Sequence, residues 1–112
     1  MRIRLYLLGL FLISLGFSQD AESLLKSKGC YSCHDVDRSK VGPPYRVIAK
    51  EYKGKPDALK TLVQSITSGS VGKWQGLASK YGITVSAFYM PRQAVTKEEA
   101  EKIAKWILSL DK

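Results

Sequence analysis

The sequence is poor in the side chains that most often bind metals or form disulfides. Its 112 residues contain one histidine, His34, and two cysteines, Cys30 and Cys33. A structural zinc site of cysteine and histidine needs about four ligands, so these three side chains exclude one. The chemically distinctive residues are therefore confined to a single stretch of five positions.

Strand-like patterns are also missing. No stretch of useful length alternates apolar and polar residues, so we predict no sheet. Apolar residues instead recur at helical spacing in Pro56–Ser68, where Leu59, Leu62, Val63 and Ile66 form one stripe. They recur again in a final helix that begins at a capping box of Thr96 and Glu99. Shorter helices are expected over Asp20–Lys28 and Tyr45–Tyr52. The fold class is therefore all-α, with four to five short helices.

One connection is unusually long. Ser70–Val95 places 26 residues between the two clearest helices, and a connection of that length in a compact domain usually has a function. Within it, Gly76–Tyr81 and Thr84–Tyr89 are each expected to form a helical turn.

The only long apolar run lies at the amino terminus. Two arginines precede Leu5–Phe17, and the small residues Gly16 and Ser18 lie at its end, which is the pattern of a secretory signal peptide. We predict that residues 1–18 are a signal peptide cleaved near Ser18 and that 19–112 form one mature domain in the periplasm. A retained membrane anchor is disfavoured, because 13 apolar residues are too few to span a bilayer.

Charge of one sign dominates. The chain has 18 basic and 10 acidic residues, a net charge of +8. Such a surface favours acidic partners and salt-sensitive association. No basic cluster is interleaved with aromatic residues, and no nucleic-acid-binding motif is present, so nucleic acid is not expected as a partner.

Cys30-Tyr31-Ser32-Cys33-His34 matches the C-x-x-C-H pattern of c-type haem attachment. Cysteines three apart on a helical turn lie on one face, so both sulfurs can bond the two vinyl groups along one haem edge. His34 then lies beneath the iron as an axial ligand. The alternatives are a disulfide, which export alone favours, and a thioredoxin-like pair, which needs a βαβ setting. We predict one covalent haem c and its iron as the cofactor.

Met90 is the only methionine after the predicted cleavage site, and it directly precedes Pro91. Proline restricts its predecessor to an extended backbone, which stiffens the segment that presents the thioether. We predict Met90 as the second axial ligand, the alternative being a packing role in the core. Without this ligand the protein would be a small enzyme or gas sensor with an open sixth site, although no distal histidine remains for catalysis. We expect Gln75–Tyr89 to fold over the methionine side of the haem.

The motifs together resemble the small bacterial class I monohaem cytochromes c, and they run in order through nearly all of the mature chain. The residues that carry the resemblance are Cys30–His34, Val41–Pro43, Gly69 with Trp74, Met90–Pro91 and Ala104–Trp106. The resemblance implies a small cytochrome c fold in which the first and last helices cross. It also implies a soluble, monomeric periplasmic electron carrier that is not an enzyme.

The resemblance assigns further residues. Pro43 would present its carbonyl to the His34 imidazole, and Trp74 would donate its indole N–H to a haem propionate. A turn role for Pro43 and a core role for Trp74 are the alternatives. Where many relatives have a basic residue that pairs with a propionate, this chain has Ser65, which leaves open whether Ser65 or Lys73 contacts that group. The implied partners are acidic redox proteins, such as a cytochrome-containing reductase and a terminal oxidase or reductase.

Overall fold

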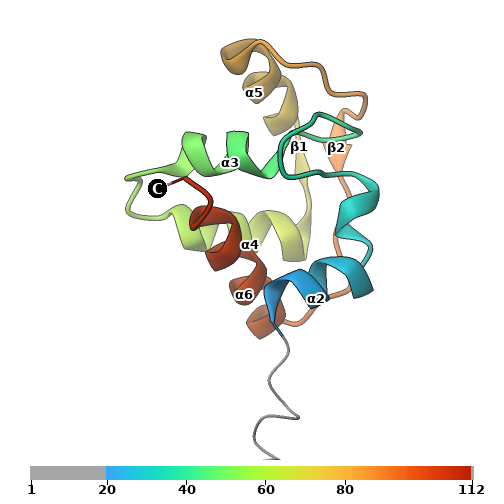
Figure 1. Ribbon diagram of the computed structural model, residues 1–112, viewed down its shortest axis with the longest axis vertical. Coiled ribbons are helices and arrows are strands. Elements are labelled where there is room, and N and C mark those ends of the chain that lie inside the picture. The colour runs from blue at the N-terminus through green and yellow to red at the C-terminus, as the bar shows by residue number, and fades with distance from the viewer. Residues whose placement is uncertain (1–19, 112) are drawn as a thin grey trace, which may run out of the picture.

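Helices surround the centre of the molecule in the computed structural model, which describes residues 20–111 (Figure 1). The predicted signal peptide, 1–18, lies outside these residues. In chain order the elements are α2 (Ala21–Ser27), the 3₁₀ turn η1 (Cys30–Ser32), α3 (Tyr45–Tyr52), α4 (Ala58–Ser68), β1 (Ser70–Val71), α5 (Lys73–Tyr81), β2 (Tyr89–Met90) and α6 (Lys97–Leu108). The prediction of a mostly helical fold with four to five short helices is confirmed.

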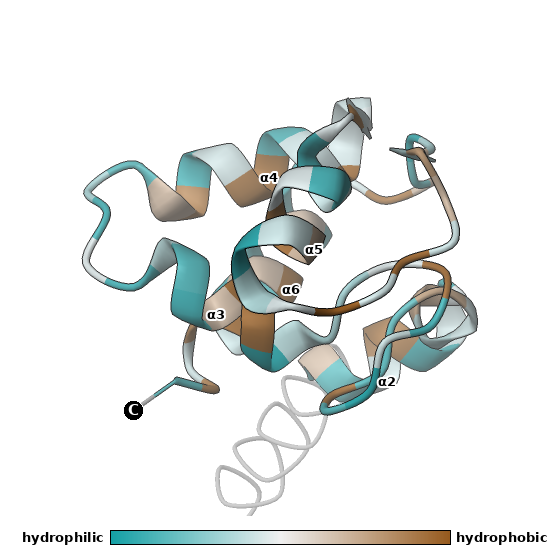
Figure 2. Ribbon diagram, turned by 90° about the horizontal axis from the view of Figure 1, so that it is seen from above, coloured by the Kyte–Doolittle hydropathy of each residue, from teal (hydrophilic) through white to brown (hydrophobic). Residues whose placement is uncertain are grey.

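The first and last described helices cross at one end of the molecule, as predicted (Figure 1). Both have capped amino termini: the Asp20 carboxylate accepts a hydrogen bond from the Ser23 N–H at 2.8 Å, and Thr96 and Glu99 form the expected capping box. The buried residues of α2 share a core with those of α6 (Leu24, Leu25, Ala100, Ile103, Ala104 and Ile107). Figure 2 shows hydrophobic segments interspersed with hydrophilic ones along the helices.

Helix α4 differs from the prediction at its start and in its buried face. It begins at Ala58 rather than Pro56, because the preceding residues form a turn in which the Ala58 N–H donates to the Lys55 carbonyl at 3.2 Å. Its fully buried stripe includes Ser65 alongside Leu62 and Ile66, whereas the predicted members Leu59 and Val63 are only partly buried. The buried stripe of α4 therefore contains a hydroxyl group, which the spacing of apolar residues does not predict.

The long connection contains the one departure from the all-α prediction. Strands β1 and β2 pair antiparallel, with Ser70 opposite Met90 and Val71 opposite Tyr89. Helix α5 begins at Lys73 rather than Gly76, and residues 84–88 form no helix. Individual hydrogen bonds hold this segment in place: the Gln75 side-chain amide donates to the Ala87 carbonyl at 2.8 Å. Such bonds do not follow a regular spacing of apolar residues, so a hydropathy pattern does not predict them.

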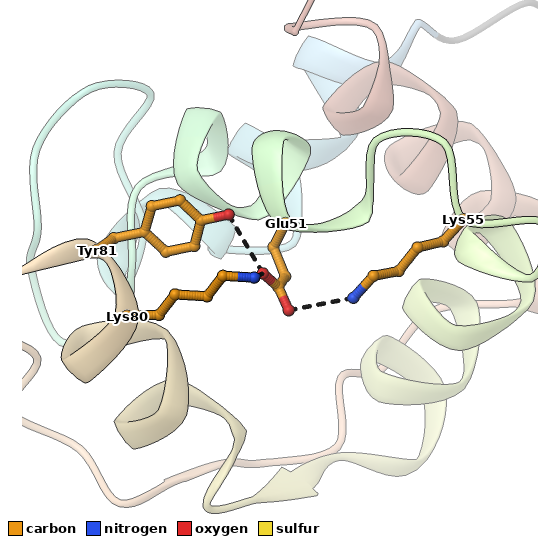
Figure 3. A network of polar contacts seen from close by, with 4 residues as sticks. All are labelled: Glu51, Lys55, Lys80 and Tyr81. Carbon is orange, nitrogen blue, oxygen red and sulfur yellow. Dashed lines mark hydrogen bonds and ion pairs between the residues drawn. The ribbon is translucent and has the colours of Figure 1, made fainter.

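A carboxylate joins α3 to α5 (Figure 3). One oxygen of Glu51 accepts hydrogen bonds from Lys80 Nζ at 2.7 Å and from the Tyr81 hydroxyl at 3.2 Å. The other oxygen accepts from Lys55 Nζ at 3.1 Å. The bond from Lys80, followed by that from Lys55, lowers the pKa of Glu51 to about 2.

We expect Glu51→Gln to lower the free energy of unfolding by about 1 kcal/mol at neutral pH, the scale of a small surface ion-pair network. A carboxylate with a depressed pKa stabilises the fold above its ordinary pKa, and this contribution is lost as the pH falls toward the folded-state value. The difference between wild type and variant should therefore shrink between pH 4.5 and about 2. Denaturant unfolding at several pH values measures it. Glu22→Gln, which removes an exposed carboxylate without an ion pair in the described chain, is the control.

Candidate functional site

The helices line a largely apolar cavity that is open to solvent at its mouth. Concave, mostly apolar sites with a few polar groups are typical of cofactor and small-molecule binding. All five α-helices of residues 20–111 contribute apolar side chains to its wall (Leu25, Ile48, Leu62, Ile66, Leu77, Ile103 and Ile107). The core of the domain is thus built around a space rather than filled by side chains alone.

Cys30, Cys33 and His34 reach this cavity from one tight turn. Gly29 ends the preceding helical segment with a positive φ of 73°. The Cys33 and His34 N–H groups then both donate to the Cys30 carbonyl, at 3.2 and 3.1 Å. Both thiols are free rather than joined in a disulfide, and burial raises the pKa of Cys30. The turn brings two potential nucleophilic sulfurs and an imidazole to the same wall.

The His34 imidazole is buried and held by a backbone carbonyl. Its Nδ1 lies 2.8 Å from the carbonyl oxygen of Pro43. Because a carbonyl can only accept, Nδ1 carries the proton, and the lone pair of Nε2 remains available to a metal. Burial lowers the pKa of His34, and this effect outweighs the opposing effect of the Pro43 bond. The environment therefore favours neutral imidazole, which is the form that ligates metals.

Three further residues fix the plane of this imidazole. Tyr45 stacks on it with ring centroids 5.1 Å apart and an interplanar angle of 29°. The Trp74 ring meets it edge-on at 5.1 Å and 86°. A Cβ on Gly42 would lie 2.7 Å from His34 Cε1 and 2.9 Å from Trp74 Cη2, so only glycine leaves both rings in place. Sequence reasoning assigned no such role to Tyr45 or Gly42, because the contacts depend on how α3 and α5 pack.

Met90 lies on β2 and lines the same cavity as His34. Its backbone pairs with Ser70, and Gly69 beside it has φ of 81°. A Cβ on Gly69 would lie 2.7 Å from the Met90 carbonyl oxygen. The Gln93 N–H also donates to the Ile66 carbonyl at 2.9 Å. The methionine segment is therefore fastened to the carboxyl end of α4.

The residues present fit a haem. Two free thiols, an imidazole with an available Nε2 and a thioether border one apolar cavity, which suits a flat, largely apolar iron macrocycle. The Tyr45 hydroxyl is buried without a hydrogen-bond partner in the described chain. The cavity wall therefore also contains a hydroxyl that is available for a hydrogen bond. Residues 20–111 contain no group of three His, Cys, Asp or Glu side chains able to hold a bare metal ion.

Fold and cavity together define a class of small helical proteins that hold a cofactor at their centre. The chain matches the cytochrome c family model over residues 18–111, and it belongs to this family. It is 42% identical to cytochrome c-552 of Hydrogenobacter thermophilus over 89 residues, covering 80% of each chain. It is 37% identical to cytochrome c-551 of Pseudomonas aeruginosa over 101 residues, covering 90% of this chain and 86% of that protein.

A solved structure agrees. The wild-type cytochrome c552 of Nitrosomonas europaea superposes with a TM-score of 0.66 at 34% identity, over 80% of this chain and 99% of that one. As a small class I monohaem cytochrome, the protein carries one covalent c-type haem with iron and acts as an electron carrier that exchanges electrons with redox partner proteins. It is not an enzyme, and the comparisons do not support the alternative of an open sixth site. Among the described helices none is long and apolar enough to cross a membrane.

Proposed function

We propose that this cytochrome is an exported carrier whose haem is bonded to Cys30 and Cys33 and whose iron is ligated by His34 and Met90. One observation carries the assignment: the sole imidazole and Met90 line the same buried cavity, and the imidazole Nδ1 is already engaged by Pro43 at 2.8 Å. Only Nε2 is then left to bind a metal. Trp74, also in this wall, is proposed to donate its indole N–H to a haem propionate.

The residues of this chain assist electron transfer by holding the two candidate iron ligands in a fixed arrangement. Bound haem supplies reversible one-electron chemistry at its iron, and thioether ligation raises the reduction potential. Pro43 holds the His34 ring, while the pairing of Ser70 with Met90 holds the methionine segment. Because both ligands are fixed before and after the electron moves, little reorganisation is needed. The apolar wall keeps water away from the site, which further favours the less charged ferrous state.

We also propose a cellular location and a class of redox partners for this cytochrome. Residues 1–18 direct export and are removed near Ser18, and the domain of 19–112 works in the periplasm as a monomer. Without Arg2 and Arg4 the chain keeps 16 basic against 10 acidic residues, so partner surfaces are proposed to be acidic. A cytochrome-containing reductase as donor and a terminal oxidase or reductase as acceptor have the required chemistry.

Expression with c-type haem maturation tests this assignment. The periplasmic protein should have the mass of residues 19–112 plus one haem, and the colour should resist acid–acetone extraction. Electron exchange with an acidic partner should slow several-fold as ionic strength rises, because screening shortens the reach of surface charge. Retention of residues 1–18 in the purified protein, or exchange rates insensitive to salt, would contradict the proposal.

A further inference from the structure

The cavity wall contains one hydroxyl at a position where the helix would otherwise present an apolar side chain. Ser65 is 8% exposed and lies between Leu62 and Ile66 on the buried stripe of α4. With His34 it is one of two buried polar residues in the described chain. Its Oγ accepts a hydrogen bond from Lys73 Nζ at 3.1 Å. A lysine from the start of α5 therefore reaches back to the wall formed by α4.

The ammonium group of Lys73 has no anionic partner among residues 20–111. The five ion pairs found there use other cations (Lys28, Arg46, Lys53, Lys55 and Lys80). Among the described side chains that line the cavity there is no aspartate or glutamate, and Lys73 is the only lysine or arginine. A charge beside a low-dielectric space is stabilised when an anion shares that space. The chain supplies no such anion, so the cavity's occupant is the natural source.

We propose that Lys73 and Ser65 form a carboxylate-binding pair that holds one haem propionate. The inference rests on the proposed haem site and extends it to the cofactor's charged edge. An ammonium has three donors, of which Ser65 uses one, and the Ser65 hydroxyl hydrogen is still free because its oxygen is accepting. Both groups can therefore donate to the same carboxylate.

Neighbouring Trp74 complements this pair. Its indole N–H has no hydrogen-bond acceptor in the part of the chain that the structure describes, and the residue is only 5% exposed. The haem carries its two carboxylates on the edge opposite the groups that bond to cysteine. The thioethers would thus fix one edge, and Lys73, Ser65 and Trp74 the other.

The test compares Lys73→Gln with Lys60→Gln in the intact haem-loaded protein. Lys60 is an exposed α4 lysine without an ion pair in the described chain, so the control removes the same charge elsewhere. A cation near the iron favours the reduced state, which carries one positive charge fewer. We expect Lys73→Gln to lower the reduction potential clearly more than Lys60→Gln. Lys73→Arg should keep the wild-type value.

A second readout reports on the propionate directly. In the ferric protein, haem methyl resonances shift as a propionate titrates, and loss of its cation should move this titration to higher pH. Ser65→Ala should give a smaller shift in the same direction. Equal potentials and equal propionate titrations for the two glutamine variants would overturn the inference while leaving the haem site intact. Failure to attach haem in the wild type would instead reject the proposed site itself.

Discussion

Replacing both attachment cysteines, Cys30→Ala with Cys33→Ala, is expected to give a largely unfolded protein without haem. The apolar core surrounds the cavity that His34 and Met90 line. An unfilled cavity costs about 24 cal/mol per Å³, so its roughly 80 Å³ of interior space costs about 2 kcal/mol when left empty. Domains of this size are stable by only ~5–15 kcal/mol. The apoprotein also loses every contact between the apolar wall and the haem, so we expect the helices alone not to hold this arrangement.

Circular dichroism and thermal melting of the double variant measure the effect. We expect weak helical signal and no cooperative transition, whereas the haem-loaded wild type melts cooperatively. The single variant Cys33→Ala is the control, because one thioether can still retain the haem in the cavity. A double variant that is helical and melts cooperatively without haem would show that the side chains close the cavity unaided.

Met90→Leu should open the sixth coordination position while leaving the fold largely intact. Leucine has nearly the volume of methionine and costs less than about 1.5 kcal/mol in a core, so the substitution removes the sulfur and little else. The ferric protein should lose the weak far-red band of sulfur-ligated haem, and the ferrous protein should bind carbon monoxide rapidly. The reduction potential should fall, because thioether ligation raises it.

Tyr89→Ala provides the matched control for this variant. Tyr89 is the adjacent residue on β2 and is 57% exposed, so its truncation tests the strand without touching the candidate ligand. It should keep the far-red band and exclude carbon monoxide. If Met90→Leu also keeps both properties of the wild type, Met90 is a packing residue and the assignment of two axial ligands is wrong.

The helices were predictable where their signals are local. The capping box of Thr96 and Glu99 and the apolar stripe of the last helix are local signals, so they predict α6 without knowledge of its tertiary contacts. The start of α4 was not predictable, because whether Pro56 begins a helix or a turn depends on how the preceding loop packs. Strands β1 and β2 have only two residues each, which is too short for any alternation to be visible.

The candidate site, too, was predictable from the sequence only in part. The attachment turn is a contiguous motif, and scarcity alone singles out His34 and Met90. The stacking of Tyr45 on His34 and the close approach at Gly42 join segments that only the fold brings together. Likewise, the bond from Lys73 to Ser65 depends on the angle at which α5 leaves β1. Sequence patterns identify the chemical groups, and three-dimensional packing determines their neighbours.

The pairing of β1 with β2 also bears on how this chain tolerates changes of length. Ser70 and Met90 meet across the ladder, so the two ends of the intervening segment lie side by side. Closing a flexible loop costs only about 0.6 kcal/mol more for each doubling of its length. Because α5 contributes Trp74 and Leu77 to the cavity wall, we expect changes of length to be tolerated in residues 82–88, which connect α5 to β2, rather than across the whole segment.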